Sequence, residues 1–345
     1  MSRTSTEAAC GLRRVALDGP TMGSRWTAVW HDDGAVDAMA VGRALAAAVG
    51  AVDDAMSTWK PESDLMRLNR AAVGPWHPVP ASLAVVLDTA LAIRRASAGA
   101  FDVGVGRLVA DWGFGAHAGK ADGLPAAPGG LDVATLEVDV AGARVRKLAP
   151  TALDLSGIAK GFGVDELARV LDAAGIENHL VGIDGEMRAR GRKPDGAPWA
   201  IAVERPEPGV RAVHGVVALE DVAVATSGDY RHFRGEGADR ISHTVDPRSS
   251  RPVRNAVASV TVLASTAMVA DAAATAITVL GSDEGLAFAG RLGLDALVLL
   301  RRPDGTLEER AGGRFAAQAD VAASAGEASS VGGVSSGASI RNHAT

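Results

Sequence analysis

Two oxygen-bearing side chains interrupt a segment that is otherwise built from small and aliphatic residues. Asp271 and Thr275 lie four positions apart in "MVADAAATAITVLG", residues 268–281, and on a helix this spacing places both on one face. A carboxylate and a hydroxyl on one face offer the oxygen ligands that Mg²⁺ prefers. The same spacing also fits a structural interpretation, in which the Asp opens the helix and the Thr hydroxyl bonds a backbone carbonyl.

A glycine-rich turn is the second candidate for a site. In "LDLSGIAKGFGVD", residues 153–165, Asp154 and Ser156 end an expected strand, and the glycines that follow let backbone approach a ligand where a helix begins. Lys160 adds a point charge suited to a phosphate. The spacing fits neither a P-loop nor a dinucleotide fingerprint, and a turn that only leads into a helix remains the alternative.

A histidine and a tryptophan in loops complete the candidates. His243 lies between Ser242 and Asp246 in "SHTVDPRSSRPV", where it could act as a general base or form a structural ion pair. Trp59 precedes a proline-broken loop and could pack in the core or stack on a planar ring. The sequence has no "GxSxG" nucleophile motif and no Cys/His spacing typical of zinc.

The composition narrows the class of protein. The chain has 345 residues and a formal net charge of -6, which argues against a nucleic-acid partner. The single cysteine, Cys10, excludes an internal disulfide, and neither it nor the N-terminal stretch has an apolar lead-in. We therefore expect a cytoplasmic protein. Residues 256–280 form the one stretch that could be taken for a membrane span, but Asp271 and many small residues argue against it.

The elements that must position these residues indicate an α+β fold. Helix patterns at 36–56, at 83–98 after Ser82, in the stretch 153–175 before Gly175, at 268–281 and at 283–293 are mixed with short strands that lack regular strand–helix alternation. We therefore expect mostly antiparallel strands with packed helices. Ser82 is a candidate N-cap and Gly99 a candidate C′ residue. We expect a flexible N-terminus at 1–14, one domain at 15–315, and a disordered Ala/Ser/Gly tail at 316–345.

Eight stretches together resemble one family, the FAD:protein FMN transferases (ApbE-type flavin transferases). They are "TMGSRWTAVW", "MSTWKPESDLMRLN", "GAFDVGVGRLVADWGFG", "LDLSGIAKGFGVD", "VGIDGEMRARG", "VATSGDYRHF", "SHTVDPRSSRPV" and "MVADAAATA". The resemblance runs from Met22 to about Arg301. It implies a flavin transferase-like fold and Mg²⁺-dependent transfer of FMN from FAD to a Ser or Thr hydroxyl of an acceptor flavoprotein, with release of AMP.

The resemblance also implies roles for individual residues. It assigns FAD contacts to Met22, Trp59, Ala100, Phe101, Asp102, Ser156, Lys160, Phe162 and Val245. It places Mg²⁺ on the backbone carbonyl of Ala159 with Asp271 and Thr275, and it adds a carbonyl from Ala274. His243 is expected to help deprotonate the incoming hydroxyl, with Asp246 orienting it.

Four positions depart from the family pattern. Trp59 stands where the family usually has tyrosine, and Phe162 replaces a common tyrosine. Asp184 in "IDGE" replaces a usual glycine, and Gly163 replaces a usual alanine. The same pocket residues would also serve an FAD pyrophosphatase or a non-catalytic flavin-binding protein, so both remain alternatives. The tail contains "SSGASI", which is similar to the Ser/Thr-Gly-Ala-Ser/Thr stretch of acceptors, so Ser339 is a candidate for self-modification.

Overall fold

The computed structural model describes residues 11–119, 124, 135–207, 209, 212–230, 233–234 and 241–316. Most of the expected flexible N-terminus and nearly all of the expected tail, with Ser339, lie outside these residues. Strand β1 begins at Arg13, two residues before the expected start of the domain at 15. Within the described part of the chain, no helix has the length and apolar character needed to cross a membrane.

The molecule is built on a twisted eight-stranded sheet, in which each neighbouring pair of strands is antiparallel. The predicted α+β class with mostly antiparallel strands is confirmed. The edge strands β1 and β17 were not predicted from the sequence. The strand order across the sheet is β1 (Arg13–Thr21), β2 (Ser24–Asp32), β6 (His179–Ile183), β7 (Glu186–Arg190), β10 (Val222–Gly228), β15 (Val257–Ala264), β16 (Asp295–Arg301) and β17 (Leu307–Gly312).

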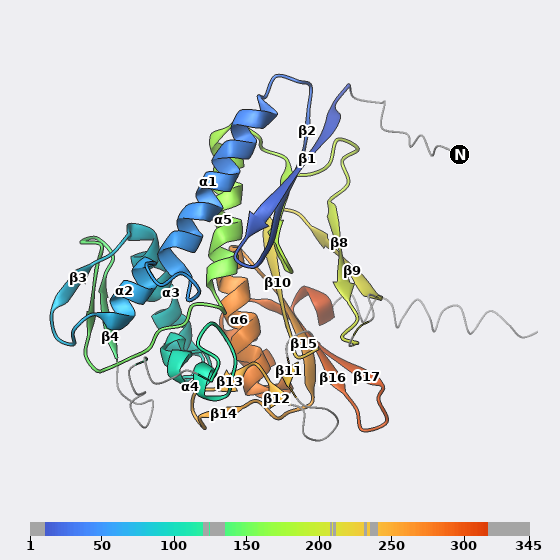
Figure 1. Cartoon of the computed structure of the whole chain (residues 1–345). Coiled ribbons are helices and arrows are strands. Elements are labelled where there is room, and N and C mark those ends of the chain that lie inside the picture. The colour runs from blue at the N-terminus through green and yellow to red at the C-terminus, as the bar shows by residue number, and fades with distance from the viewer. Residues whose placement is uncertain are drawn as a thin grey trace, which may run out of the picture.

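Alternating residues send side chains to the two faces of this sheet, as the period of a strand requires. On β10, Ala225 packs toward the core beneath the helices, whereas its neighbour Val224 packs toward the separate hairpin of β8 (Trp199–Glu204) and β9 (Val213–Leu219). On β16, Val298 and Leu299 divide in the same way. Figure 1 shows α1, α5 and α6 on one side of the sheet and β8–β9 on the other.

The remaining elements surround this sheet. The helices are α1 (Ala38–Met56), α2 (Asp64–Arg70), α3 (Ala81–Ala96), the 3₁₀ turn η1 (Val103–Val105), α4 (Gly106–Asp111), α5 (Ala159–Ala173), α6 (Ala267–Leu280) and α7 (Ser282–Arg291). The smaller strands are β3 (Trp76–Pro78), β4 (Leu136–Asp139), β5 (Arg144–Lys147), β11 (Phe233–Arg234), β12 (Ile241–Ser242), β13 (Val245–Asp246) and β14 (Arg251–Pro252).

The ends of α3 differ from the prediction. The helix begins at Ala81, and Pro80 occupies the N-cap position without a side-chain hydrogen bond, so Ser82 lies inside the first turn. At the other end Ser97 is the C-cap, so Ala98, and not the predicted Gly99, is the C′ residue; both have positive φ. The predicted serine cap is absent because Pro80 occupies the N-cap with extended backbone, and its side chain has no oxygen to accept a hydrogen bond.

Helices α5 and α6 are joined by a buried carboxylate. Asp165 of α5 accepts hydrogen bonds from the backbone N–H groups of Ala267 and Met268, each at 2.9 Å, at the first turn of α6. Arg188 of β7 donates to the same carboxylate at 2.6 Å. The two helices approach so closely that a Cβ on Gly161 would run into the carbonyl oxygen of Ala267. The start of α6 is therefore fixed against the glycine-rich turn that leads into α5.

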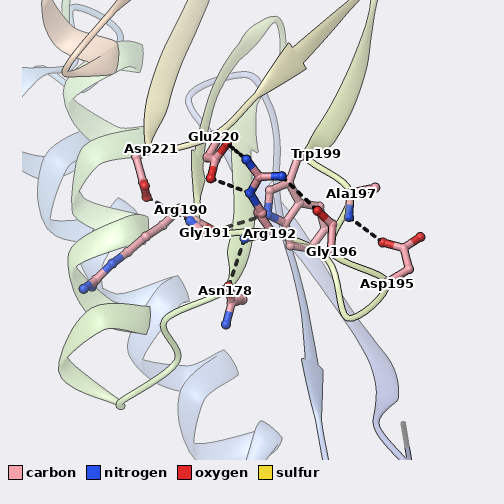
Figure 2. A network of polar contacts seen from close by, with 10 residues as sticks. All are labelled: Asn178, Arg190, Gly191, Arg192, Asp195, Gly196, Ala197, Trp199, Glu220 and Asp221. Carbon is pink, nitrogen blue, oxygen red and sulfur yellow. Dashed lines mark hydrogen bonds and ion pairs between the residues drawn. The ribbon is translucent and has the colours of Figure 1, made fainter. Parts of the chain in front are cut away.

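The β8–β9 hairpin is anchored at its base by a network of polar contacts (Figure 2). The Arg192 guanidinium donates from Nε and Nη2 to the two carboxylate oxygens of Glu220, each at 2.5 Å, which is the strong bidentate form of this pair. Trp199 donates from Nε1 to the Arg190 carbonyl at 3.2 Å. These contacts tie the segment before β8 to the turn after β9.

A buried histidine gives the fold a dependence on pH. His179 on β6 is fully buried, and its Nδ1 lies 2.9 Å from the carbonyl oxygen of Ile176. Burial lowers the pKa of His179 below the ordinary 6.5, although the Ile176 carbonyl and Asp172 oppose the shift. Below pH 6.5 the unfolded chain therefore binds a proton more readily than the folded protein. The free energy of unfolding decreases as the pH is lowered through this range.

We expect His179→Gln to remove part of the acid sensitivity of the fold. The free energy of unfolding of the unmodified protein should decrease between pH 7.5 and pH 5 by on the order of 1 kcal/mol per unit of pKa shift, and the variant should show a shallower slope. Urea denaturation across this pH range measures both slopes. Equal slopes in the two proteins would show that His179 does not contribute.

Candidate functional site

A cavity of about 560 Å³ gathers most of the residues singled out from the sequence. Its wall is formed by the loop around η1, the turn before α5, the β6–β7 turn, strand β8, the end of β10, the β12–β13 segment and one face of α6. The predicted residues that line it are Ala100, Phe101, Asp102, Ser156, Lys160, His243, Val245, Asp271 and Thr275.

Asp271 lies on the second turn of α6 and is buried at the cavity wall. Its Oδ2 accepts the backbone N–H of Gly161 at 3.1 Å, which connects it to the glycine-rich turn. Burial, with the nearby Glu186 carboxylate, raises the pKa of Asp271 to about 7, although Lys160 and the Gly161 N–H oppose this rise. A buried carboxylate with a raised pKa is typical of a functional site.

Thr275 faces the same cavity one turn further along α6. Its Oγ1 lies 3.4 Å from the Ser227 hydroxyl, and a Cβ on Gly157 would stand 3.1 Å from that oxygen. Within the described residues, Thr275 does not bond a backbone carbonyl; Thr278 does so instead, donating to the Ala274 carbonyl at 2.9 Å. The structural interpretation of the Asp271/Thr275 pair is therefore the weaker one.

Lys160 stands among three carboxylates. Its Nζ lies 2.8 Å from Oε1 of the buried Glu186 and 3.7 Å from Oδ2 of the half-exposed Asp184. Burial disfavours the charge on Lys160, but Glu186, Asp271 and Asp184 outweigh it and raise its pKa above the ordinary value. The lysine therefore carries its charge at the cavity wall. Burial also raises the pKa of Glu186, against the effect of Lys160.

His243 reaches the cavity from the segment between β12 and β13. Val245, two residues on, is buried and lines the same wall. Asp246 was expected to orient His243. Its carboxylate accepts the Arg248 side chain at 3.0 Å and the Arg248 backbone N–H at 2.9 Å, and the orienting role stays a prediction.

The "AFD" segment contributes backbone and apolar surface to the site. Ala100 and Phe101 are buried at the cavity wall. Asp102 accepts Arg94 Nε at 2.6 Å with one oxygen and the Gly104 N–H at 2.7 Å with the other. Both oxygens of Asp102 therefore help to shape the η1 turn.

Four predicted residues lie close to the cavity without lining it. Ala159 is the first residue of α5 and precedes Lys160. Phe162 is buried in the core beneath α5, and Met22, in the β1–β2 turn, packs its side chain over Gly163. Ala274 is fully buried, and its carbonyl already accepts the Thr278 hydroxyl.

Trp59 lies at a separate hollow of about 830 Å³ and is 73% exposed. A small hollow of about 10 Å³ lies between the two sites. It shares Phe114 and Asp154 with the main cavity and Thr58 and Asn69 with the Trp59 hollow. Trp59 itself lines only the outer hollow, so its stacking role stays a prediction.

Two roles at the site were not identified from the sequence. Glu186 was not singled out, and Asp184 was named only as a departure from the family pattern in the short "IDGE" after a buried strand. Asp184 has a φ of 53°, in the left-handed region where glycine is favoured. Asp165 lay within a quoted motif, but only the structure shows that it holds the first turn of α6.

The oxygen atoms at this wall suit a hard cation. Among the described residues, no group of three or more His, Cys, Asp or Glu side chains is arranged to hold a metal. Asp271 and Thr275 nevertheless present one carboxylate and one hydroxyl to the cavity. Mg²⁺ is commonly bound through one or two carboxylates with substrate phosphates and water filling the other positions, so this donor set fits it.

Comparison with known proteins identifies the class. The model of the ApbE family matches residues 22–298, and the chain belongs to this family. An FAD:protein FMN transferase of Haemophilus influenzae is 36% identical over 304 residues, covering 84% of this chain and 88% of that protein. Its counterpart in Escherichia coli is 32% identical over 299 residues, covering 84% and 85%.

Solved structures agree with this assignment. "Flavin Transferase ApbE from Vibrio cholerae" has a TM-score of 0.77 and 36% identity, covering 88% of this chain and 98% of that one. The apo form of Pseudomonas stutzeri flavinyl transferase ApbE has a TM-score of 0.76 and 34% identity, covering 88% and 96%. The family and the flavin transferase-like fold predicted from the sequence are confirmed.

The raised pKa of Asp271 predicts that the metal-free protein loses stability toward alkaline pH. Its folded pKa of about 7 lies above the ordinary 3.8, so the folded protein binds the proton more readily between these values, and stability falls as pH rises through the interval. In EDTA, the free energy of unfolding should decrease from pH 5 to pH 8, on the order of 1 kcal/mol per pKa unit. Asp271→Asn should flatten this decrease, and an unchanged profile in the variant would contradict the assignment.

Proposed function

We propose that this protein transfers FMN from FAD to a Ser or Thr hydroxyl of an acceptor flavoprotein and releases AMP. The observation that carries the proposal is the convergence of Asp271, Thr275, Lys160 and His243 on one cavity, from three segments distant in the sequence. The names of the relatives support transfer of FMN from FAD to a protein. The hydroxyl acceptor is what the family resemblance implies, and the dependence on Mg²⁺ is supported by the oxygen atoms of Asp271 and Thr275 at the cavity wall.

Mg²⁺ would be held by the side chains of Asp271 and Thr275 and by the backbone carbonyl of Ala159, which opens α5 beside Lys160. A carbonyl from Ala274 is the weakest part of this set, because the Thr278 hydroxyl already bonds it. When bound, the ion would neutralise charge on the diphosphate oxygens and fix their position.

Side chains of the protein bind the phosphate and remove the proton. Lys160 provides a positive charge at the wall for a phosphate oxygen. The acceptor hydroxyl oxygen attacks the phosphorus of the FMN half of FAD. A new P–O bond forms while the bond from that phosphorus to the bridging oxygen breaks, and AMP leaves with the bridging oxygen. His243 takes the hydroxyl proton, because an imidazole can act as a general base near neutral pH.

The acceptor is proposed only by its chemistry. A segment similar to Ser/Thr-Gly-Ala-Ser/Thr would place a small hydroxyl residue between residues that do not obstruct the cavity. The chain's own Ser339 meets this description, although it lies outside the described residues. The cytoplasmic location expected from the sequence stays a prediction.

Asp271→Asn should abolish the transfer reaction. The amide keeps the shape of the side chain but lacks the charge that binds Mg²⁺, so we expect the rate to fall by at least ~100-fold. In-gel flavin fluorescence of a denatured acceptor, after incubation with FAD and Mg²⁺, measures the product. The control is Asp283→Asn on α7, which is exposed and outside the cavity. Free FMN and AMP without a labelled acceptor would indicate a hydrolase, and turnover by Asp271→Asn would remove the metal assignment.

Trp59→Ala should weaken FAD binding if the indole stacks on the flavin ring. Loss of one aromatic stack is worth about 0.5–1.5 kcal/mol, so we expect the dissociation constant to rise by roughly 2- to 10-fold, measured by flavin fluorescence anisotropy. Trp112→Ala is the matched control, because Trp112 is also partly exposed but lines a different hollow. Equal affinities in the two variants would place the flavin elsewhere.

A further inference from the structure

Glu186 has a buried carboxylate that the reaction described above does not use. It is the first residue of β7, only 3% exposed, and it lines the cavity. One oxygen, Oε1, lies 2.8 Å from Lys160 Nζ. The other, Oε2, is buried without a hydrogen-bond partner among the described residues. The carboxylate thus directs its one strong contact at the ammonium group of Lys160.

This pair is not explained by stability alone. Removing a carboxylate and an ammonium from water costs about as much as their attraction returns, and apolar residues of similar size often stabilise a fold as well or better. A buried carboxylate with one unsatisfied oxygen is a further cost. A role in placing the Lys160 side chain would account for the pair.

More than one carboxylate lies close enough to pair with Lys160. Asp271 and Asp184 both act on Lys160 electrostatically, together with Glu186. Asp184 is 37% exposed and 3.7 Å away, so solvent screens it more strongly. Without Glu186, the buried counter-charge left to Lys160 would be Asp271, the same carboxylate that is proposed to bind Mg²⁺.

We propose that Glu186 is a positioning residue that holds the Lys160 ammonium away from Asp271, which leaves the Asp271 carboxylate open to the cation and Lys160 directed at the diphosphate. The inference rests on the proposed function, because it assumes a cation at Asp271. It gives the two buried carboxylates beside Lys160 separate partners: Glu186 pairs with Lys160, and Asp271 binds the ion.

The test compares four variants by calorimetric titration with Mg²⁺ alone and then with FAD. Glu186→Gln removes the charge and keeps the shape, while Glu186→Asp keeps the charge and shortens the reach by one methylene. Both should weaken Mg²⁺ binding by about 10- to 100-fold, because the Lys160 ammonium group would then pair with Asp271. Loss of a residue that supports a metal ligand typically has an effect of this size. Asp184→Asn, which removes the more exposed carboxylate, should change it by less than ~3-fold.

The fourth variant guards against loss of folding. Lys160→Met with Glu186→Met replaces the ion pair by apolar side chains of similar length, a change that buried pairs often tolerate. No lysine then competes for Asp271, so Mg²⁺ affinity should stay within ~3-fold of the unmodified protein, whereas FAD affinity should fall. Thermal unfolding of each variant separates binding from stability.

Two results would overturn the inference and leave the proposed function intact. The first is unchanged Mg²⁺ affinity in both Glu186→Gln and Glu186→Asp with only a lower melting temperature, which would make the pair structural. The second is a double Met variant that binds Mg²⁺ as weakly as Glu186→Gln. If the unmodified protein itself fails to bind Mg²⁺, the proposed function falls, and the inference falls with it.

Discussion

The site depends on one contact between two helices. Asp165 on α5 receives the first two free N–H groups of α6, so the helix that carries Asp271 and Thr275 starts at a fixed place against the helix that carries Lys160. Backbone N–H groups at a helix start are unsatisfied unless a partner is supplied. Here the partner comes from a neighbouring helix, so that satisfying the α6 terminus also sets the position of its side chains relative to the glycine-rich turn.

The second constraint is electrostatic. One lysine, held among Asp184, Glu186 and Asp271, leaves an excess of negative charge at a wall that is proposed to receive a diphosphate. Two anions do not approach in a space of low dielectric without a cation between them. The proposed divalent cation would therefore take part in substrate binding, and not only in the chemical step.

Residue patterns alone predicted part of this arrangement. The four-residue spacing of Asp271 and Thr275 placed them correctly on one helix face, and the glycine-rich turn was correctly expected to begin a helix. The pairing of Glu186 with Lys160 could not be predicted, because β7 and α5 meet only after the sheet has formed. The contact of the Asp246 carboxylate with Arg248, two residues further on, was also not predicted. The resemblance to a family supplied roles that spacing could not, such as the stacking surface of Trp59.

The seam between α5 and α6 leaves no room for even one added carbon at Gly161, because the carbonyl of Ala267 occupies that space. The exposed indole of Trp59, in contrast, stands on an open rim. Substitutions are therefore tolerated more readily at Trp59 than at Gly161. If the indole stacks on the flavin ring as proposed, other aromatic side chains at this position would adjust how long the substrate stays, while the proposed phosphate end is held to one backbone geometry. Divergence in substrate retention can then accumulate without disturbing the reacting centre.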